Sequence, residues 1–257
     1  MRLYEKALPD DLEAAYLVPL SDLHVGDLHH NDKYLRGLLQ WVSETPNCFL
    51  LLNGDLANVA TKTSKTDVYE ETRNPKEQRD YLVNLFLPFS DRVLGITEGN
   101  HERRIRELTS LDICEDLAKA LSPTGQIPYG REALALKVTL GKDSHNRRVA
   151  YVIYMTHGWS AARTPGAKVN MTTSLGNVVL ADVYITGHTH EKFAMQRDFL
   201  VPDPQNNTIR QAKQLYVSCG ADLDYEGYAV GRGYRPGSKG VPRIRLDGKR
   251  KDAHVSL

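Results

Sequence analysis

The segment RVLGITEGNHERRI, residues 92–105, joins an apolar run to three residues that carry chemistry. The run RVLGIT (92–97) has the β-branched, apolar character of a buried strand. It leads to Gly99, which permits tight backbone geometry, to Asn100, which offers a neutral carbonyl oxygen, and to His101, whose ring titrates near neutrality. A turn would account for Gly-Asn alone. The histidine therefore indicates a functional site at the end of this strand.

Further apolar runs end at residues that can bind a metal ion. The runs are 15–20, 48–53, 148–155 and 181–186, and the residues that follow them are Asp22, His24, Asp55, His157, His188 and His190. Open α/β sheets bind ligands beyond the carboxyl ends of their strands, so we expect these side chains to meet at one edge. Asp, Asn and His ligands without cysteine favour Mn²⁺, Fe or Zn²⁺ over Ca²⁺ or a thiolate centre.

The spacing within two pairs of these residues has a physical meaning. In Asp22-x-His24 and in His188-x-His190, an extended backbone would point both side chains of a pair to the same face. Together with Asn100 the candidate ligands number seven, which is too many for one tetrahedral ion. They fit two ions that share a bridging carboxylate, the arrangement that clamps attacking and leaving oxygens in phosphoryl displacement.

The rest of the chain alternates helical and strand patterns, as in a layered α/β fold. Helices are expected at 31–45, 75–89 and 111–122, strands at 133–140, 213–219 and 241–246, and loops at 59–74 and 159–170. No repeat, linker or composition shift marks a boundary. A single domain over residues 1–257 is the interpretation.

Composition limits the classes of protein. The chain has 257 residues, 41% hydrophobic and 25% charged, which is typical of a soluble globular protein, and its net charge of +1 argues against non-specific binding to nucleic acid or membranes by the whole surface. Cys48, Cys114 and Cys219 are odd in number and widely spaced, which favours a reducing compartment. The N-terminal segment has no signal-peptide pattern and no membrane span is expected, so a cytoplasmic location is predicted.

The motifs SDLHVGD, LLNGDLAN, EGNHE, THG and TGHTH resemble, in this order, the five motifs of the calcineurin-like metallophosphoesterase superfamily. The resemblance runs from Asp22 to His190 and implies a four-layer α/β/β/α sandwich of two mixed sheets, with a dinuclear metal site at the strand C-terminal ends. The compact chain and its Tyr- and Gly-rich stretch 222–251 are similar to phage-type members.

The resemblance also implies roles for single residues. It implies a first metal ion held by Asp22, His24, Asp55 and His190, and a second held by Asp55, Asn100, His157 and His188. Asp55 would bridge the two divalent ions, for which Mn²⁺ is favoured and Fe or Zn²⁺ is an alternative. His101 would contact the phosphate and protonate the leaving oxygen, while water activated by the metals attacks phosphorus in line.

The second motif departs from that of the Ser/Thr protein phosphatases in this superfamily. Those enzymes have GDxxDRG, whereas this chain has Gly-Asp-Leu-Ala-Asn-Val-Ala and lacks the arginine that grips a phosphate dianion. Asn58 resembles the polar residue found there in phosphodiesterase members, although a turn would also explain it. Candidates to replace the arginine are Arg103, Arg104, Arg163 and Lys168, although an exposed helix face is the preferred explanation of Arg103 and Arg104.

These observations predict a phosphodiesterase that acts on nucleic acid or a nucleotide-like diester, with His101 as general acid. A phosphomonoesterase acting on a nucleotide or small phosphate is the alternative, and a non-enzymatic scaffold is a third, weaker hypothesis. The predicted partner is a phosphoester substrate rather than a membrane. The sequence selects neither an oligomeric state nor the residue that orients His101, for which Asp67 and other carboxylates of 59–80 are candidates.

Overall fold

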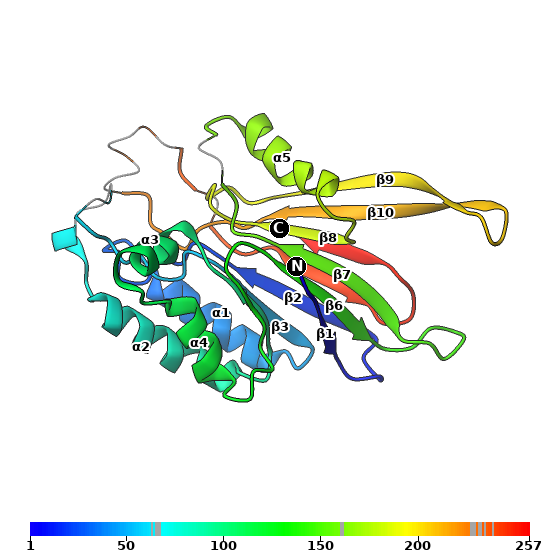
Figure 1. The fold of residues 1–257 in the computed structure, drawn as a ribbon, viewed down its shortest axis with the longest axis horizontal. Helices are drawn as coiled ribbons and strands as arrows, with labels where there is room; N and C mark the ends of the chain where they lie inside the picture. Colours follow the sequence, from blue (N-terminus) through cyan, green and yellow to red (C-terminus); the bar gives the residue numbers. More distant parts are fainter. Residues whose placement is uncertain are drawn as a thin grey trace.

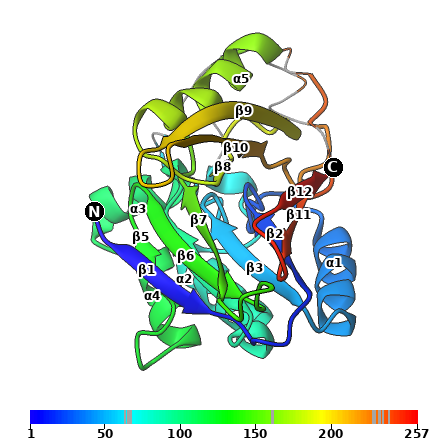
Figure 2. The ribbon, with the colours of Figure 1, turned by 90° about the vertical axis from the view of Figure 1, so that its right-hand side faces the viewer.

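Two six-stranded mixed sheets pack face to face, and helices cover their outer faces (Figures 1 and 2). The computed structural model describes residues 1–62, 64, 68–159, 162–226, 230, 233, 235–237 and 239–257. Tyr228, Arg232 and Tyr234 of the Tyr- and Gly-rich stretch lie outside the described residues, as does Asp67. The predicted α/β/β/α sandwich is confirmed.

Sheet B supplies the N-terminal half of the site. Its strand order is β12-β11-β2-β3-β4-β5. The bounds are β2 (Ala14–Leu20), β3 (Cys48–Asn53), β4 (Val93–Thr97), β5 (Tyr129–Gly130), β11 (Arg243–Asp247) and β12 (Ala253–Ser256). The first four are parallel to one another, so the ends of β2, β3 and β4 meet at one edge.

Helices cover the outer face of sheet B. They are α1 (Asp32–Glu44), α2 (Pro75–Phe86), α3 (Asn100–Thr109) and α4 (Ile113–Leu121), with 3-10 turns η1 (Val68–Glu70) and η2 (Leu87–Phe89). Asn31 caps α1 by accepting from the Tyr34 amide, and Asn74 and Glu77 form a capping box at the start of α2. Residue 75, a proline, takes the first helical position of α2, where its missing N–H costs nothing.

Sheet A supplies the other half, in the order β1-β6-β7-β8-β10-β9. The bounds are β1 (Leu3–Ala7), β6 (Leu134–Leu140), β7 (Val149–Met155), β8 (Val183–Thr186), β9 (Phe193–Asp203) and β10 (Thr208–Ser218), and α5 (Pro165–Ser174) with η3 (Leu175–Asn177) covers its outer face. Strands β7 and β8 are parallel, so their ends also meet at one edge. The β9–β10 hairpin projects beyond the rest of the sandwich (Figure 1).

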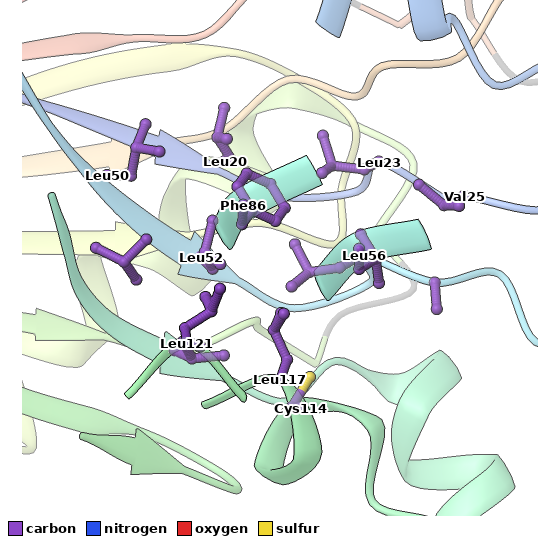
Figure 3. Packing of buried hydrophobic residues seen from close by; sticks show 14 of the residues in the cluster. Leu20, Leu23, Val25, Leu50, Leu52, Leu56, Phe86, Cys114, Leu117 and Leu121 are labelled. Atoms are coloured by element: carbon purple, nitrogen blue, oxygen red, sulfur yellow. The ribbon is translucent and has the colours of Figure 1, made fainter. Parts of the chain in front are cut away.

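Alternating side chains of β3 build two separate cores. Leu50 and Leu52 point to the helices, where they pack with Phe86 and Leu117 (Figure 3). Leu51 packs instead between the two sheets. Because successive side chains of a strand point to opposite faces, a strand covered on both faces is apolar throughout, and all six residues of β3 are buried. Burial of each leucine contributes about 1.5–3 kcal/mol. The site strands are thus held by packing on both faces.

Some elements differ from the sequence prediction. The expected loop 159–170 is wrong in its second half, because α5 begins at Pro165, and β10 begins at Thr208 instead of residue 213. Strands β1, β9 and β12 were not predicted. β9 is an edge strand whose residues are exposed or only half-buried, so it lacks the apolar run that identified the central strands. Among the helices of the described residues, none has the length and apolar character needed to cross a bilayer.

Candidate metal centre

The ends of β2 and β3 are joined by backbone hydrogen bonds beyond the strands. The Asp22 amide donates to the Gly54 carbonyl and the His24 amide donates to the Asp55 carbonyl, both over 3.0 Å. These bonds bring the carboxylates of Asp22 and Asp55 to the same edge of sheet B. Both side chains are buried, at 0% and 2% exposure.

Hydrogen bonds also join the two sheets at this edge. The His188 amide donates to both carboxylate oxygens of Asp22, over 3.1 and 3.0 Å. His157 Nδ1 lies 2.9 Å from the carbonyl oxygen of Asn53. A carbonyl oxygen can only accept, so this contact places a hydrogen on Nδ1 and leaves Nε2 of His157 toward the cluster. Imidazoles of sheet A therefore face carboxylates of sheet B.

Seven acidic and histidine side chains form three overlapping groups whose ligand atoms lie within 4.8 Å of one another. The groups are Asp22, His24 and His190; His24, Asp55 and His101; and Asp55, His157 and His188. Asp55 and His24 each belong to two groups. All predicted acidic and histidine ligands are therefore brought together, as the convergence of strand ends predicts.

The shortest contacts lie between atoms that ordinarily bind metals. His190 Nε2 is 3.2 Å from Asp22 Oδ1, and His157 Nε2 is 3.1 Å from Asp55 Oδ2. The buried Oδ1 atom of Asn100 has no hydrogen-bond partner among the described residues. Burying an unpaired amide oxygen costs free energy unless a cation or other partner meets it. The donor set and this orphaned oxygen fit a site for divalent metal ions.

The backbone at the ligands is left-handed. The φ angles are +56° at Asp22, +49° at His24, +49° at Asp55, +68° at His188 and +53° at His190. The prediction that an extended backbone aligns the two i, i+2 pairs is therefore wrong, because β2 and β8 end before the pairs begin. Left-handed geometry costs non-glycine residues roughly 1–2 kcal/mol each. Such strain concentrates at functional sites, where the surrounding structure fixes it.

Burial and neighbouring charges oppose each other in this cluster. Burial acts to raise the pKa of Asp55, but His157, His101 and His24 outweigh it and hold this pKa well below its usual value. Burial likewise acts to lower the pKa of His157, and the carboxylates of Asp55 and Asp22 raise it to about 10. The opposing charges keep both carboxylates ionised. They therefore provide the negative charge that a metal cation needs.

Glu102 supports the loop that carries Asp55. Its buried carboxylate accepts hydrogen bonds from the amides of Asp55 (3.0 Å), Ala57 (2.8 Å) and Gly99 (3.0 Å). Burial, followed by the charge of Asp55, raises the pKa of Glu102 to about 7. The sequence motif EGNHE does not by itself predict this supporting role. The position of Glu102, third in α3, where capping-box carboxylates stand, is the feature from which the role could have been predicted.

His101 is oriented by a backbone carbonyl. Its Nδ1 lies 2.7 Å from the carbonyl oxygen of Asn58, and because that oxygen only accepts, Nδ1 carries a hydrogen. Its Nε2 lies 3.9 Å from Asp55 Oδ2, and its ring packs edge-on against His24 at 4.6 Å between centroids. Within the described residues, a main-chain carbonyl thus takes the orienting role for which Asp67 and the other carboxylates of 59–80 are candidates.

The predicted substrate contacts are engaged with other protein groups. Arg104 donates to the carbonyls of Asn58 (3.1 Å) and Val59 (3.3 Å), behind the His101 ring. The side chain of Asn58 donates to Glu71 over 2.5 Å and to Asp27 over 3.4 Å.

The other basic candidates lie on both sides of the cluster. Arg103 pairs with the buried Glu98 at 3.8 Å, and Lys168 pairs with Glu191 at 2.7 Å. Arg163 is exposed in the segment before α5. Lys168 also donates to the Thr189 carbonyl, between the predicted ligands His188 and His190.

The chain is a two-sheet α/β sandwich with a His/Asp cluster at the strand ends. The family model for calcineurin-like phosphoesterases matches residues 23–192. Since this match spans more than half of the sequence, the chain belongs to the calcineurin-like phosphoesterase family. Membership supports metal-dependent hydrolysis of a phosphoester.

Comparisons with solved structures return matches at low identity. No curated protein matches the chain. Calcineurin-like phosphoesterase YfkN from Bacillus subtilis is 14% identical with a TM-score of 0.41, over 95% of this chain and 90% of that chain. A putative 5'-nucleotidase from Staphylococcus aureus in complex with alpha-ketoglutarate is 12% identical with a TM-score of 0.44, over 95% of this chain and 53% of that chain. Wild-type Vps29 complexed with zinc from Entamoeba histolytica is 11% identical with a TM-score of 0.39, over 94% of this chain and 97% of that chain.

Proposed function

We propose that the protein is a phosphodiesterase that uses two divalent metal ions to hydrolyse nucleic acid or a nucleotide-like diester. The observation that carries the proposal is the position of Asp55, whose carboxylate belongs to two of the three ligand groups. A carboxylate shared in this way suits a bridge between two ions. When bound, such ions polarise the phosphoester and activate water.

The chain offers a ligand set for each ion. Asp22, His24, Asp55 and His190 would hold the first, and Asp55, Asn100, His157 and His188 would hold the second. The orphaned oxygen of Asn100 and the inward Nε2 of His157 support the second set. Hard oxygen and borderline nitrogen donors suit Mn²⁺, with Fe or Zn²⁺ as alternatives.

His101 supplies the acid in this proposal. The Asn58 carbonyl accepts from Nδ1, which leaves Nε2 on the side of Asp55 to carry the proton that passes to the leaving oxygen. Protonation at both nitrogens is compatible with that contact, because the carbonyl accepts from Nδ1 in either state. General acid catalysis by a positioned histidine contributes typically 10²–10⁴-fold.

The preference for a diester rests on the second motif, which lacks the arginine that grips a phosphate dianion in the protein phosphatases. A phosphomonoester dianion is usually gripped by bidentate arginine. Of the predicted contacts, Arg104 is engaged by two carbonyls of the protein itself, and Arg103 lies 3.8 Å from the Glu98 carboxylate. A diester carries one negative charge, which needs less compensation by cationic side chains.

The cysteines support a cytoplasmic location as a further part of the proposal. Cys48, Cys114 and Cys219 are buried free thiols, which is typical of a reducing compartment.

The proposal is tested by turnover of the Mn²⁺-loaded protein on bis(4-nitrophenyl) phosphate and on 4-nitrophenyl phosphate. We expect the larger kcat/KM for the diester. A larger value for the monoester would replace the proposal by a phosphomonoesterase, and no turnover with no bound metal would favour a scaffold.

A variant separates His101 from the metal ligands. His101→Ala should lose about 10²–10⁴-fold in kcat while its metal content is unchanged. His145→Ala is the matched control, because His145 is an exposed histidine on the turn between β6 and β7. Equal turnover of both variants would remove His101 from the chemistry.

A further inference from the structure

A large aromatic side chain is exposed close in the chain to a predicted metal ligand. Trp159 is 59% exposed and follows His157 by two residues. The other tryptophan of the chain, Trp41, is a residue of α1 and packs against the core. An exposed large aromatic residue is informative because burial of such a ring is favourable in water.

The backbone at Trp159 is fixed next to the predicted ligands. A Cβ atom placed on Gly158 would lie 3.4 Å from the Cβ of His188 and 3.5 Å from the Gly187 carbonyl oxygen. Gly158 also has φ of +103°, a conformation that side-chain-bearing residues rarely adopt. The chain therefore passes against the loop that carries His188, and Trp159 branches from it at the next residue.

A second contact links the region after β7 to the loop that carries His188. Lys168, in the first turns of α5, donates to the Thr189 carbonyl over 3.0 Å and pairs with Glu191 at 2.7 Å. The connection from β7 to α5 thus contacts the segment 187–191 at both its ends. Trp159 therefore lies, along the chain, between two residues that contact the loop of His188 and His190.

Two of the basic residues predicted to contact substrate are engaged by the protein itself. Arg104 donates to the Asn58 carbonyl, and Lys168 pairs with Glu191. An aromatic contact would add to the remaining ion pairs in holding the part of the substrate that flanks the phosphoester. A tryptophan face is suited to a flat π-system, and base–aromatic stacking works with every base.

We infer that Trp159 stacks on an unpaired nucleobase next to the phosphoester that is cleaved. This inference deepens the proposed function and rests on it: the substrate class is single-stranded nucleic acid or a short oligonucleotide, whose bases are free to stack. One stacked base corresponds to about 5- to 100-fold in affinity.

Binding is measured first, without hydrolysis. Trp41→Phe leaves Trp159 as the single tryptophan, so its fluorescence reports on the site. An eight-nucleotide phosphorothioate oligothymidylate, added to the Mn²⁺-loaded protein, should quench this fluorescence saturably. An abasic phosphorothioate oligomer of the same length and charge should quench it far less. Equal quenching by both oligomers, or none by either, would overturn the inference.

Kinetics then separate stacking from chemistry. Thymidine 5′-(4-nitrophenyl phosphate) and methyl 4-nitrophenyl phosphate share a leaving group and differ in the base. Trp159→Ala should raise KM for the thymidine diester about 5- to 100-fold with kcat changed less than about 2-fold, should leave the methyl diester unaffected, and should be rescued by Trp159→Phe.

A control variant and a separate outcome complete the test. Leu200→Ala removes a side chain that is 72% exposed on β9, in the hairpin that projects from the sandwich, and should change neither substrate. Equal losses on both substrates in Trp159→Ala would assign Trp159 a structural role and overturn the inference. If wild type hydrolyses neither diester, the proposed function fails, and the fluorescence titration still decides whether Trp159 binds bases.

Discussion

The two sheets contribute different chemistry to the same site. Sheet B provides both carboxylates, Asp22 and Asp55, together with the imidazole of His24 and the amide of Asn100, which follows its strand β4. From sheet A come imidazoles alone: His157 follows β7, and His188 and His190 follow β8. Two of the three ligand groups combine a carboxylate from sheet B with histidine from sheet A.

The two halves also differ in how they are supported. On sheet B, the loop of Asp55 is held by the buried carboxylate of Glu102 through three amide hydrogen bonds. On sheet A, the His188 loop is held by Asp22, which belongs to the opposite sheet, and by Lys168 at the rim. The Asp55 loop is therefore supported within sheet B. The His188 loop takes hydrogen bonds from across the interface as well as from its own sheet, where the Gly187 amide donates to the His157 carbonyl.

The largest effect is expected from removing the shared charge. Asp55→Asn keeps the size of the side chain and its oxygen toward the His101 amide, but it removes the negative charge common to two ligand groups. Activity should fall by more than about 100-fold, since loss of outer-shell partners alone costs 10–100-fold. Turnover and metal content are measured together. Asp198→Asn, on the exposed edge strand β9, is the control. Full metal content in Asp55→Asn would contradict the role of Asp55 as a ligand shared by two ions.

Metal removal tests whether a cation joins the two sheets. A ligand that binds only the native state at 100 times its Kd stabilises it by about 2.7 kcal/mol. For a chain of this size, that change lowers Tm by about 5–10 °C on chelation. His188→Ala should lose most of this metal-dependent stabilisation, because it removes an imidazole of sheet A. Thermal unfolding with and without Mn²⁺ measures the difference, and identical Tm values in the wild type would contradict the account.

The support of the Asp55 loop within sheet B is tested by substituting Glu102. Glu102→Gln replaces one acceptor oxygen by an NH₂ group, so at least one amide among Asp55, Ala57 and Gly99 loses its partner. Leaving a buried donor unsatisfied costs about 1–3 kcal/mol of unfolding free energy. Urea unfolding of the metal-free protein measures this loss. An unchanged midpoint would show that the sheet B loop does not depend on Glu102.

The smallest effect is expected at the rim of sheet A. Lys168→Met removes an ion pair with Glu191 in which both side chains are partly exposed, at 16% and 32%. Solvent screening limits such a pair to about 0.2–1 kcal/mol. Lys119→Met, which removes the exposed pair with Glu115 on α4, is the matched control and should change stability less. A larger loss in the control would remove Lys168 as an anchor of the His188 loop.

The strands that deliver the ligands could be predicted from the sequence, because burial on both faces makes β3 and β4 continuous apolar runs. The edge strand β9 could not, since its side chains are exposed or half-buried. The sequence predicts which residues form the site, but it does not predict their backbone conformation. The left-handed backbone of Asp22 and His188 accompanies a hydrogen bond between the two sheets, a tertiary contact that no local pattern encodes. The partner of His101 is a main-chain carbonyl, and any residue type could supply it.

Electron paramagnetic resonance of the Mn²⁺-loaded protein, with metal content determined on the same sample, tests the central claim most directly. The account predicts two Mn²⁺ ions per chain with the signal of an exchange-coupled pair, which Asp55→Asn converts to that of isolated ions or abolishes. One ion per chain, or two ions without coupling in the wild type, would contradict a centre bridged by Asp55.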